Sequence, residues 1–352
     1  MSKIDELLKN ALSQNSSDLH FISGDPPRVR VHGALKLLDD QALSIDTVQE
    51  ALYEIMTGST QKDFEVNDTV DFAYEIKKLS RFRVNVMRHL NGVGAVFRTI
   101  PSKALTLQEL SMPEVVDNLC KQTQGMILVT GKTGSGKSTT LAAMIDAINK
   151  RLKGHIITIE DPIEFVHNRQ NCLISQREVG RHTDNFAAAL HSALREDPDV
   201  ILVGELRDLE TISAAVTAAE MGILVMGTLH TNGAAQTVDR IINSFPAEKQ
   251  AHIRTMLSTS LRGVISQQLL PKKDKSGRLA ALEIMVNTPA VANQIRQGKL
   301  EQLETSMQSG KRAGMQTMDT ALMNLVEQNQ VSALDAYHQA NNKAKFKSLI
   351  GD

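Results

Sequence analysis

The 352-residue sequence has few aromatic residues and no excess of charge. It holds no Trp, three Tyr and nine Phe, so aromatic residues make up 3% of the chain. Proteins that bind single-stranded nucleic acid stack its bases on such side chains. The 39 Lys and Arg are balanced by 40 Asp and Glu, which gives a formal net charge of −1. This composition argues against a nucleic-acid partner, and we expect no direct binding of DNA or RNA.

Cysteine and long apolar runs are scarce as well. Cys120 and Cys172 are the two cysteines, too few for a disulfide framework, and they form no Cys-x-x-Cys pair. Such usage fits a reducing compartment. No apolar run approaches the roughly 20 residues that cross a bilayer, and Met1 to Asn15 lacks the apolar stretch of a signal peptide. We therefore expect a cytoplasmic protein that reaches a membrane through a partner.

The first hundred residues predict a small α+β domain. Hydrophobic residues make up 41% of the chain, and its length leaves room for two or three domains. Helical spacing of apolar residues predicts helices at 4–12 and 45–56, and alternation predicts strands at 18–22, 27–38, 70–76, 81–90 and 93–100. We expect an antiparallel sheet in domain 1–100, followed by a proline-bounded linker at 101–113.

Beyond the linker, apolar strands alternate with helices. We predict strands at 126–130, 155–160, 200–203 and 223–229, and helices at 138–152, 185–196 and 209–221. This alternation is typical of an α/β domain whose mostly parallel sheet is covered on both faces. The expected domain spans 114–352, and its last part, from about residue 289, is helical by period.

One glycine-rich stretch carries the strongest chemical signal. It has the pattern G-x-x-x-x-G-K-S and reads Gly131-Lys132-Thr133-Gly134-Ser135-Gly136-Lys137-Ser138-Thr139. Glycines let backbone N–H groups turn toward a phosphate, and the following helix N-terminus adds positive charge. Lys137 would reach the β- and γ-phosphates and the Ser138 hydroxyl would ligate Mg²⁺. The alternative is a glycine turn that merely caps a helix, which the flanking strand and helix disfavour.

Turnover of a bound triphosphate would also need carboxylates. Glu205 follows the apolar strand 200–203, and Glu164 lies just beyond the strand 155–160. The carboxyl ends of parallel strands meet at the edge of the sheet where ligands bind. Either acid, taken alone, could equally be a solvated loop residue or a helix cap. Together with the phosphate loop they favour a catalytic site.

His230 and three arginines complete the candidate residues. His230 ends the strand 223–229 and could sense a γ-phosphate by hydrogen bonding, although a lone His is more often structural. Arg81, Arg83 and Arg98 lie on predicted strands of the first domain. An arginine from a neighbouring subunit could stabilise the charge of a transferred phosphoryl group, whereas the alternative is that all three are solvated surface residues. No His has zinc-ligand spacing.

With these segments identified, the sequence resembles the secretion ATPase superfamily, and within it the PilT-type retraction ATPases of type IV pili. The matching motifs are the Walker A loop at 131–138, the Asp box ITIEDPIEF at 157–165, the Walker B segment ILVGELRD at 201–208 and the His box beginning at 227. The resemblance implies a PAS-like N-terminal domain, a RecA-like P-loop domain, and a homo-hexamer with ATP between subunits. By the same resemblance, Glu164 is the general base, Glu205 the Mg²⁺-associated and water-associated glutamate, and His230 the His-box residue. It also implies that Arg81, Arg83 and Arg98 reach the nucleotide.

The resemblance implies a hexameric motor that hydrolyses ATP and drives pilin depolymerisation, and hence twitching motility. Its expected partners are an inner-membrane pilus platform protein and a paralogous retraction ATPase. The chain departs from the family pattern at Lys132, where Pro is usual, at Ile223, where a further His is common, and at Ala292 and Gln297 in the C-terminal segment tied to retraction. These departures leave the glycines of the loop intact.

Three other functions stay open from the sequence. The chain could be an accessory retraction paralogue that contributes little hydrolysis, or an assembly or type II secretion ATPase. The two cysteines argue against the second, because those relatives normally carry a four-cysteine zinc element. A RecA-like nucleic-acid translocase is disfavoured by the near-neutral charge.

Overall fold

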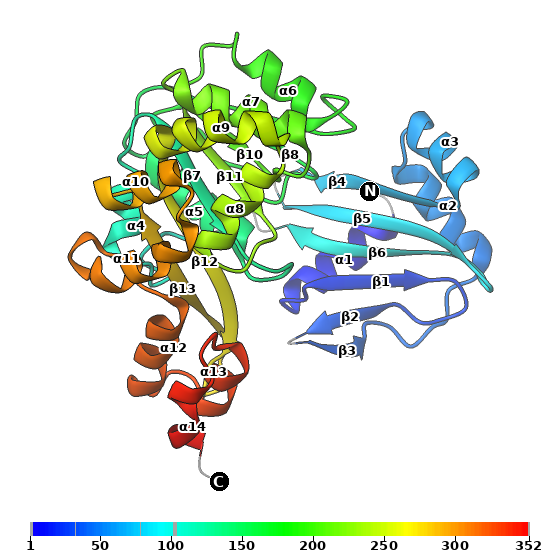
Figure 1. Cartoon of the computed structure of the whole chain (residues 1–352). Coiled ribbons are helices and arrows are strands. Elements are labelled where there is room, and N and C mark those ends of the chain that lie inside the picture. The colour runs from blue at the N-terminus through cyan, green and yellow to red at the C-terminus, as the bar shows by residue number, and fades with distance from the viewer. Residues whose placement is uncertain (1–2, 32, 78, 101–103, 351–352) are drawn as a thin grey trace. The chain divides into compact units, whose positions relative to one another are not determined.

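The computed structural model describes residues 3–31, 33–77, 79–100 and 104–350. The chain divides into two compact units. The N-terminal unit comprises Met1–Lys103 and Glu164–Val166, and the C-terminal unit comprises Ala104–Ile163 and His167–Asp352. Each unit contains one sheet (Figure 1). None of the helices in these described ranges combines the length and apolar character needed to cross a bilayer.

The N-terminal unit is an antiparallel sheet with three helices. The sheet has the order β3-β2-β1-β6-β5-β4. Its strands are β1 (Asp18–Ile22), β2 (Arg28–Val31), β3 (Ala34–Leu37), β4 (Thr69–Ile76), β5 (Ser80–His89) and β6 (Gly92–Ile100), and the helices are α1 (Lys3–Ser13), α2 (Ile45–Ile55) and α3 (Gly58–Asn67). Phe21, Phe82 and Phe97 are almost fully buried in the core that the sheet shares with these helices. Their alternation with polar residues along the strands explains why sequence pattern located this sheet.

The structure differs from the sequence prediction at two places in this unit. The single strand expected at 27–38 is a hairpin of β2 and β3, in which Gly33 adopts a φ of +85°. A glycine at this position allows the reversal because it tolerates the left-handed conformation. Helix α3 was not predicted, since Phe64 is the one buried residue recorded along it and no apolar period results. Of the predicted linker 101–113, residues 101–103 lie outside the described residues.

The C-terminal unit is built on a seven-stranded sheet with the order β13-β12-β7-β11-β10-β8-β9. The strands are β7 (Gly125–Thr130), β8 (His155–Glu160), β9 (Leu173–Glu178), β10 (Val200–Val203), β11 (Leu224–Leu229), β12 (Leu261–Pro271) and β13 (Arg278–Val286). Neighbouring strands are parallel except for β12 and β13. The predicted α/β class with a mostly parallel sheet is therefore confirmed.

Helices cover both faces of this sheet. They are α4 (Glu114–Leu119), α5 (Lys137–Asn149), α6 (Phe186–Ala193), α7 (Leu209–Glu220), α8 (Ala234–Asn243) and α9 (Ala247–Ser260). Along β7, Met126 and Leu128 face the core formed with α6 to α9, whereas Ile127 and Val129 face the core formed with α4 and α5. Both faces of β7 are thus apolar, which is why its sequence is a continuous apolar run rather than an alternating one.

The chain ends in short helices, as the sequence predicted for the region beyond about residue 289. They are α10 (Pro289–Gln297), α11 (Leu303–Ser309), α12 (Met318–Glu327), α13 (Ala333–Gln339) and α14 (Ala344–Ile350), with two 3₁₀ turns at Leu300–Gln302 and Lys311–Ala313. Helices α12 to α14 form a small core of their own around Leu322 and Phe346, against Leu270 and Ala281 of the sheet.

Candidate active site

The glycine-rich loop joins the end of β7 to the start of α5, as the sequence predicted. β7 is buried at every residue. Gly131, Gly134 and Gly136 have φ values of +140°, +77° and +88°, which side chains with a Cβ rarely adopt. Gly136 immediately precedes α5, so the N-terminus of a thirteen-residue helix opens onto the loop. Exposed N–H groups and a helix N-terminus in this arrangement form an anion-binding site.

Lys137 folds back over the loop. Its side chain is almost buried, and Nζ donates hydrogen bonds to the carbonyl oxygens of Gly131 at 2.8 Å and Lys132 at 3.1 Å. The ammonium group is therefore held beside the same backbone segment that would receive a phosphate. In the described structure, the buried hydroxyl of Ser135 has no hydrogen-bond partner. An unpaired buried hydroxyl is costly, and a phosphate oxygen would supply a partner, so the loop fits a nucleotide phosphate.

Glu205 follows β10, the second strand from β7 in the sheet. Its Oε1 accepts a hydrogen bond from Arg207 Nε at 2.6 Å and lies 3.2 Å from His230 Nε2. Burial alone would raise the pKa of the Glu205 carboxyl, but the hydrogen bonds and charges of Arg207 and His230 outweigh burial and lower it. Glu205 is thus ionised at neutral pH, as a ligand for a divalent cation must be.

His230 connects Glu205 to the phosphate loop. A carboxylate accepts hydrogen bonds only, so Nε2 must donate to Glu205, and in a neutral imidazole Nδ1 then becomes an acceptor. Nδ1 lies 3.5 Å from Thr133 Oγ1, and in this neutral tautomer the Thr133 hydroxyl is the donor. Side chains that follow β7, β10 and β11 consequently meet at one edge of the sheet. Of the predicted site residues, the structure brings together the loop, Glu205 and His230.

Arg207 belongs to this cluster although the sequence analysis gave it no role. It lies two residues after Glu205, in the loop that leads to α7, and Asp161 adds a second negative charge near its guanidinium. The hydrogen bond to Glu205 raises the pKa of Arg207 above its ordinary value. Its position could have indicated that it belongs to the cluster. Arg207 lies in the Walker B segment just beyond a strand end, and charged side chains there lie at the edge of the sheet where ligands bind.

The remaining predicted residues belong to the N-terminal unit. Glu164 groups with that unit and lies in a segment without helix or strand. Arg83 and Arg98 face each other across β5 and β6, and Arg81 lies opposite Ile100. Arg98 Nε donates to Asp18 at 2.9 Å, and Arg83 Nε lies 3.7 Å from Asp71. Arg83 and Arg98 therefore have carboxylate partners inside their own sheet.

Ser138 and Glu205 were predicted as the Mg²⁺ ligands. Ser138 lies in the first turn of α5, directly after Lys137, and is half-buried. Among the residues that the structure describes, no cluster of three or more His, Cys, Asp and Glu side chains could hold a metal ion by itself. A hydroxyl and a carboxylate fit Mg²⁺, which takes few protein ligands and completes its shell with water and phosphate oxygens.

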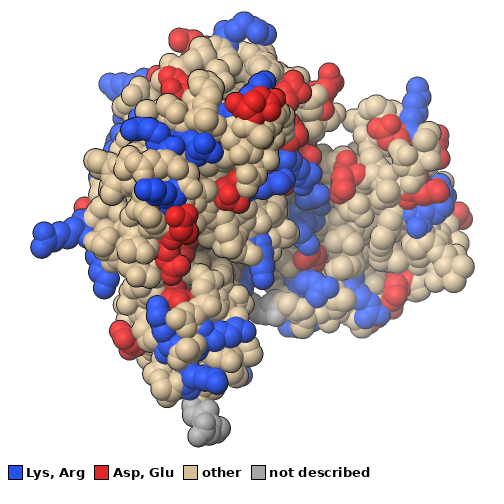
Figure 2. Space-filling view, viewed as in Figure 1, with Lys and Arg blue, Asp and Glu red and all other residues tan. Residues whose placement is uncertain are grey.

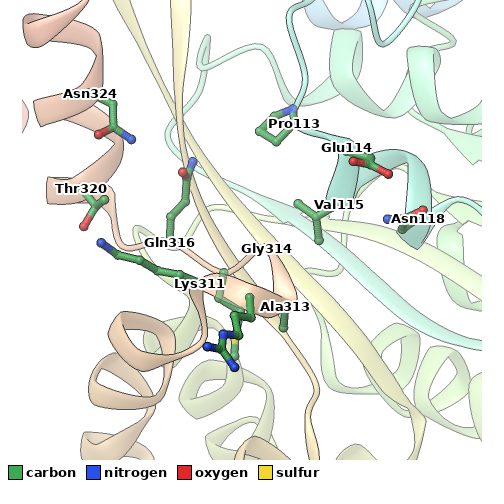
Figure 3. A pocket seen from close by; sticks show the side chains of 12 residues that line it. Pro113, Glu114, Val115, Asn118, Lys311, Ala313, Gly314, Gln316, Thr320 and Asn324 are labelled. Atoms are coloured by element: carbon green, nitrogen blue, oxygen red, sulfur yellow. The ribbon is translucent and has the colours of Figure 1, made fainter.

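The C-terminal unit also contains a cavity of about 770 Å³ at a different place. Figure 3 shows Glu114, Val115 and Asn118 of α4 facing Lys311, Gln316 and Thr320 across it. None of the residues that line it comes from the phosphate loop, so it is not the nucleotide site. Acidic and basic side chains both occur on the visible face of each unit (Figure 2), in keeping with the near-zero net charge.

The fold and the loop together define a P-loop ATPase, a nucleotide-binding enzyme. The chain belongs to the family described as Type II/IV secretion system protein, whose model matches residues 1–350. It is 51% identical over 343 residues to the type IV pilus retraction ATPase PilT of Pseudomonas aeruginosa, covering 97% of this chain and 99% of that relative. It is 39% identical over 348 residues to the type IV pilus ATPase PilU of the same organism, with 99% and 91% covered.

A solved structure agrees over the same length. The crystal structure of the pilus retraction motor PilT with bound ADP superimposes with a TM-score of 0.92 at 43% identity, covering 98% of this chain and 99% of that one. The likeness extends through both units of the chain. The resemblance proposed from the sequence motifs is thereby confirmed.

Proposed function

We propose that this protein is a homo-hexameric motor that hydrolyses ATP to drive retraction of type IV pili by depolymerising pilin. The observation that carries the proposal is the chain of contacts from Thr133 of the phosphate loop through His230 to Glu205. It links the phosphate-binding element to a carboxylate suited to Mg²⁺ that follows β10, the second strand from β7. The identity to PilT, a retraction ATPase by name, supports the biological output.

Binding would be the work of the loop. Lys137 Nζ, now bonded to two loop carbonyls, would exchange those contacts for the β- and γ-phosphates. Ser138 and Glu205 would hold Mg²⁺. That ion would supply positive charge beside the phosphates. His230 would respond to the γ-phosphate, because a ligand bound at Thr133 would compete with His230 Nδ1 for the Thr133 hydroxyl.

Hydrolysis then requires a base and further positive charge. By its match to the family, Glu164 would take the proton from water as the water oxygen bonds to the γ-phosphorus and the bond to the bridging oxygen breaks. Arg81, Arg83 and Arg98 would act from a neighbouring subunit of the ring on the charge of the transferred group. These roles, like the domain boundaries 1–100, 101–113 and 114–352, remain predictions.

A lesser alternative is an accessory role beside another retraction ATPase. The chain is more similar to PilT than to PilU, at 51% against 39% identity over nearly the same length, which favours the autonomous motor. As partners we propose an inner-membrane platform protein of the pilus machine and a paralogous ATPase. We place the protein in the cytoplasm, at the inner-membrane base of that machine.

The test compares two lysines of one helix. Lys137→Ala should abolish phosphate release by the purified protein, because the loop loses its ammonium group. Lys150 is the C-cap residue of the same helix and is half exposed, with Asp146 as its partner. Because it lies at the end of the helix away from the loop, Lys150→Ala should leave the rate within about twofold of wild type. Equal rates for the wild type and Lys137→Ala would contradict an ATPase at this loop.

The biological output is tested in cells. A deletion strain complemented with the wild type or with Lys137→Ala is scored for surface pili and twitching. Excess, immobile pili in the deletion and Lys137→Ala strains support retraction. Loss of pili would instead indicate an assembly ATPase, and unchanged twitching would contradict the proposal.

A further inference from the structure

Gln267 is a buried polar residue in the middle of β12, on the strand next to β7. Its side chain is 2% exposed, yet both ends of its amide are satisfied. Nε2 donates to the Ser135 carbonyl oxygen at 2.7 Å, and Oε1 accepts from Thr140 Oγ1 at 2.7 Å. Burying an amide is costly unless each end has a partner, so this geometry is strongly favoured over other side-chain positions. One residue of β12 therefore binds both the phosphate loop and the first part of α5.

The glycines of the loop show how close this approach is. A Cβ on Gly131 would lie 2.3 Å from the Gln267 carbonyl oxygen, and a Cβ on Gly136 would lie 2.7 Å from Gln267 Nε2. Real Cβ atoms do not approach other atoms so closely. Gly131 and Gly136 are thus required by the packing of the loop on Gln267 as well as by their positive φ angles.

The bond to Ser135 also orients a peptide group. In a trans peptide the C=O and the following N–H point in opposite directions. Because Gln267 holds the Ser135 carbonyl toward β12, it also fixes the direction of the Gly136 N–H, which belongs to the same peptide group. This N–H is one of the backbone donors that the loop could offer to a phosphate.

The neighbouring residue gives an internal comparison. Gln268 follows Gln267 directly, and successive side chains of a strand point to opposite faces. Gln268 is half-buried, and its Oε1 has no hydrogen-bond partner among the described residues. Of the two adjacent glutamines, Gln267 contacts the phosphate loop and Gln268 lies on the other face of the strand. The sequence does not reveal this difference.

We propose that Gln267 is a positioning residue that holds the phosphate loop in its nucleotide-binding conformation. The proposal rests on the proposed function, in that the loop receives a nucleotide. Gln267 acts through the Gly136 N–H and the start of α5. Its loss should therefore weaken nucleotide binding more than it changes the rate of the bound complex.

The experiment measures the affinity of the full-length protein for a fluorescent ADP analogue, together with KM and kcat for ATP. Gln267→Met keeps the volume of the side chain but leaves the Ser135 carbonyl and the Thr140 hydroxyl unpaired. Gln267→Glu keeps the acceptor for Thr140 and loses the donor to Ser135. We expect Kd and KM to rise about tenfold or more in both variants, because the loop is no longer held in its binding conformation and an unpaired buried group favours other conformations.

Gln268→Met is the matched control and should bind as the wild type does. The melting temperature without nucleotide separates positioning from general stability, because a merely structural role lowers it and leaves Kd unchanged. Wild-type Kd and KM in both Gln267 variants, or an equal rise in Gln268→Met, would overturn the inference. If the wild type itself bound no nucleotide, the proposed function would fail instead.

Coupling between the two partners gives a second readout. Thr140→Val removes the hydroxyl that donates to Gln267 Oε1. If that bond positions the loop, the effects of Thr140→Val and Gln267→Met on Kd are not additive, and the double variant binds about as weakly as Gln267→Met. Strict additivity of the two effects would contradict the proposed linkage through Thr140.

Discussion

The two sheets of this protein use their charged side chains differently. In the antiparallel sheet, Arg98 and Arg83 lie on strand faces and find carboxylates on neighbouring strands, Asp18 and Asp71. In the parallel sheet, Glu205 lies beyond the end of a strand, where it meets side chains that follow other strands. Charges on a strand face are taken up by cross-strand pairing, whereas charges at the carboxyl edge of a parallel sheet remain accessible to a ligand.

The sharpest test of this difference is Glu205→Ala. We expect phosphate release to fall about 10²- to 10³-fold, as for other groups that stabilise developing charge. Stability should change by less than about 1 kcal/mol, because both partners, Arg207 at 68% and His230 at 41% exposure, can be solvated once the carboxylate is gone. Phosphate-release and urea-unfolding measurements check the two halves of this prediction. A variant as active as the wild type would show that Glu205 is not part of the site.

Arg98→Ala should destabilise the fold, which Glu205→Ala should not. The Asp18 side chain is 7% exposed. Without Arg98, this nearly buried carboxylate would keep a hydrogen bond from the Ser17 hydroxyl and would lie 4.0 Å from Arg30 Nε. We expect a loss of about 1–3 kcal/mol in the free energy of unfolding, measured in urea. Unchanged stability combined with lost ATPase activity would break the comparison, because Arg98 would then act at the nucleotide alone.

The pH dependence of stability follows from the same pair. Burial opposes ionisation of Asp18, but hydrogen bonds from Ser17 and Arg98 and the charge of Arg98 outweigh it, so its pKa lies below the usual 3.8. A carboxyl with a lowered pKa stabilises the fold above its unfolded pKa and loses that contribution as pH falls through the folded pKa. The free energy of unfolding, measured from pH 7 down to about pH 2, should therefore decline below about pH 4. Asp18→Asn should reduce that decline, and an unchanged profile would contradict the assignment.

Arg83→Ala should have the smallest effect on stability. Arg83 and Asp71 are both about half exposed, at 44% and 53%, and their atoms are 3.7 Å apart. Exposed pairs of this kind contribute about 0.5 kcal/mol or less, which urea unfolding barely resolves. Arg83→Ala is also the control for Arg98→Ala, since both remove an arginine from the same sheet. A stability loss as large as that of Arg98→Ala would show that exposure does not govern these pairs.

Much of the fold was predictable because its signals are local. Strands β7, β8, β10 and β11 are apolar runs, and α5 and α7 have helical periods next to them, so pattern alone located their ends within three residues. The pair β12–β13 was not predicted. β12 carries buried polar residues such as Ser266 and Gln267 among its apolar ones, and this mixture fits neither a buried run nor strict alternation.

By itself the sequence determined the phosphate loop and its place between a strand and a helix, because glycine, lysine and serine at fixed spacing are needed locally for that chemistry. Tertiary structure alone decided what holds the loop. Gln267 contacts Ser135 and Thr140, which lie 132 and 127 residues earlier in the chain. Such a contact exists only once β12 has paired with β7, and strand pairing over that distance leaves no periodic trace in the sequence.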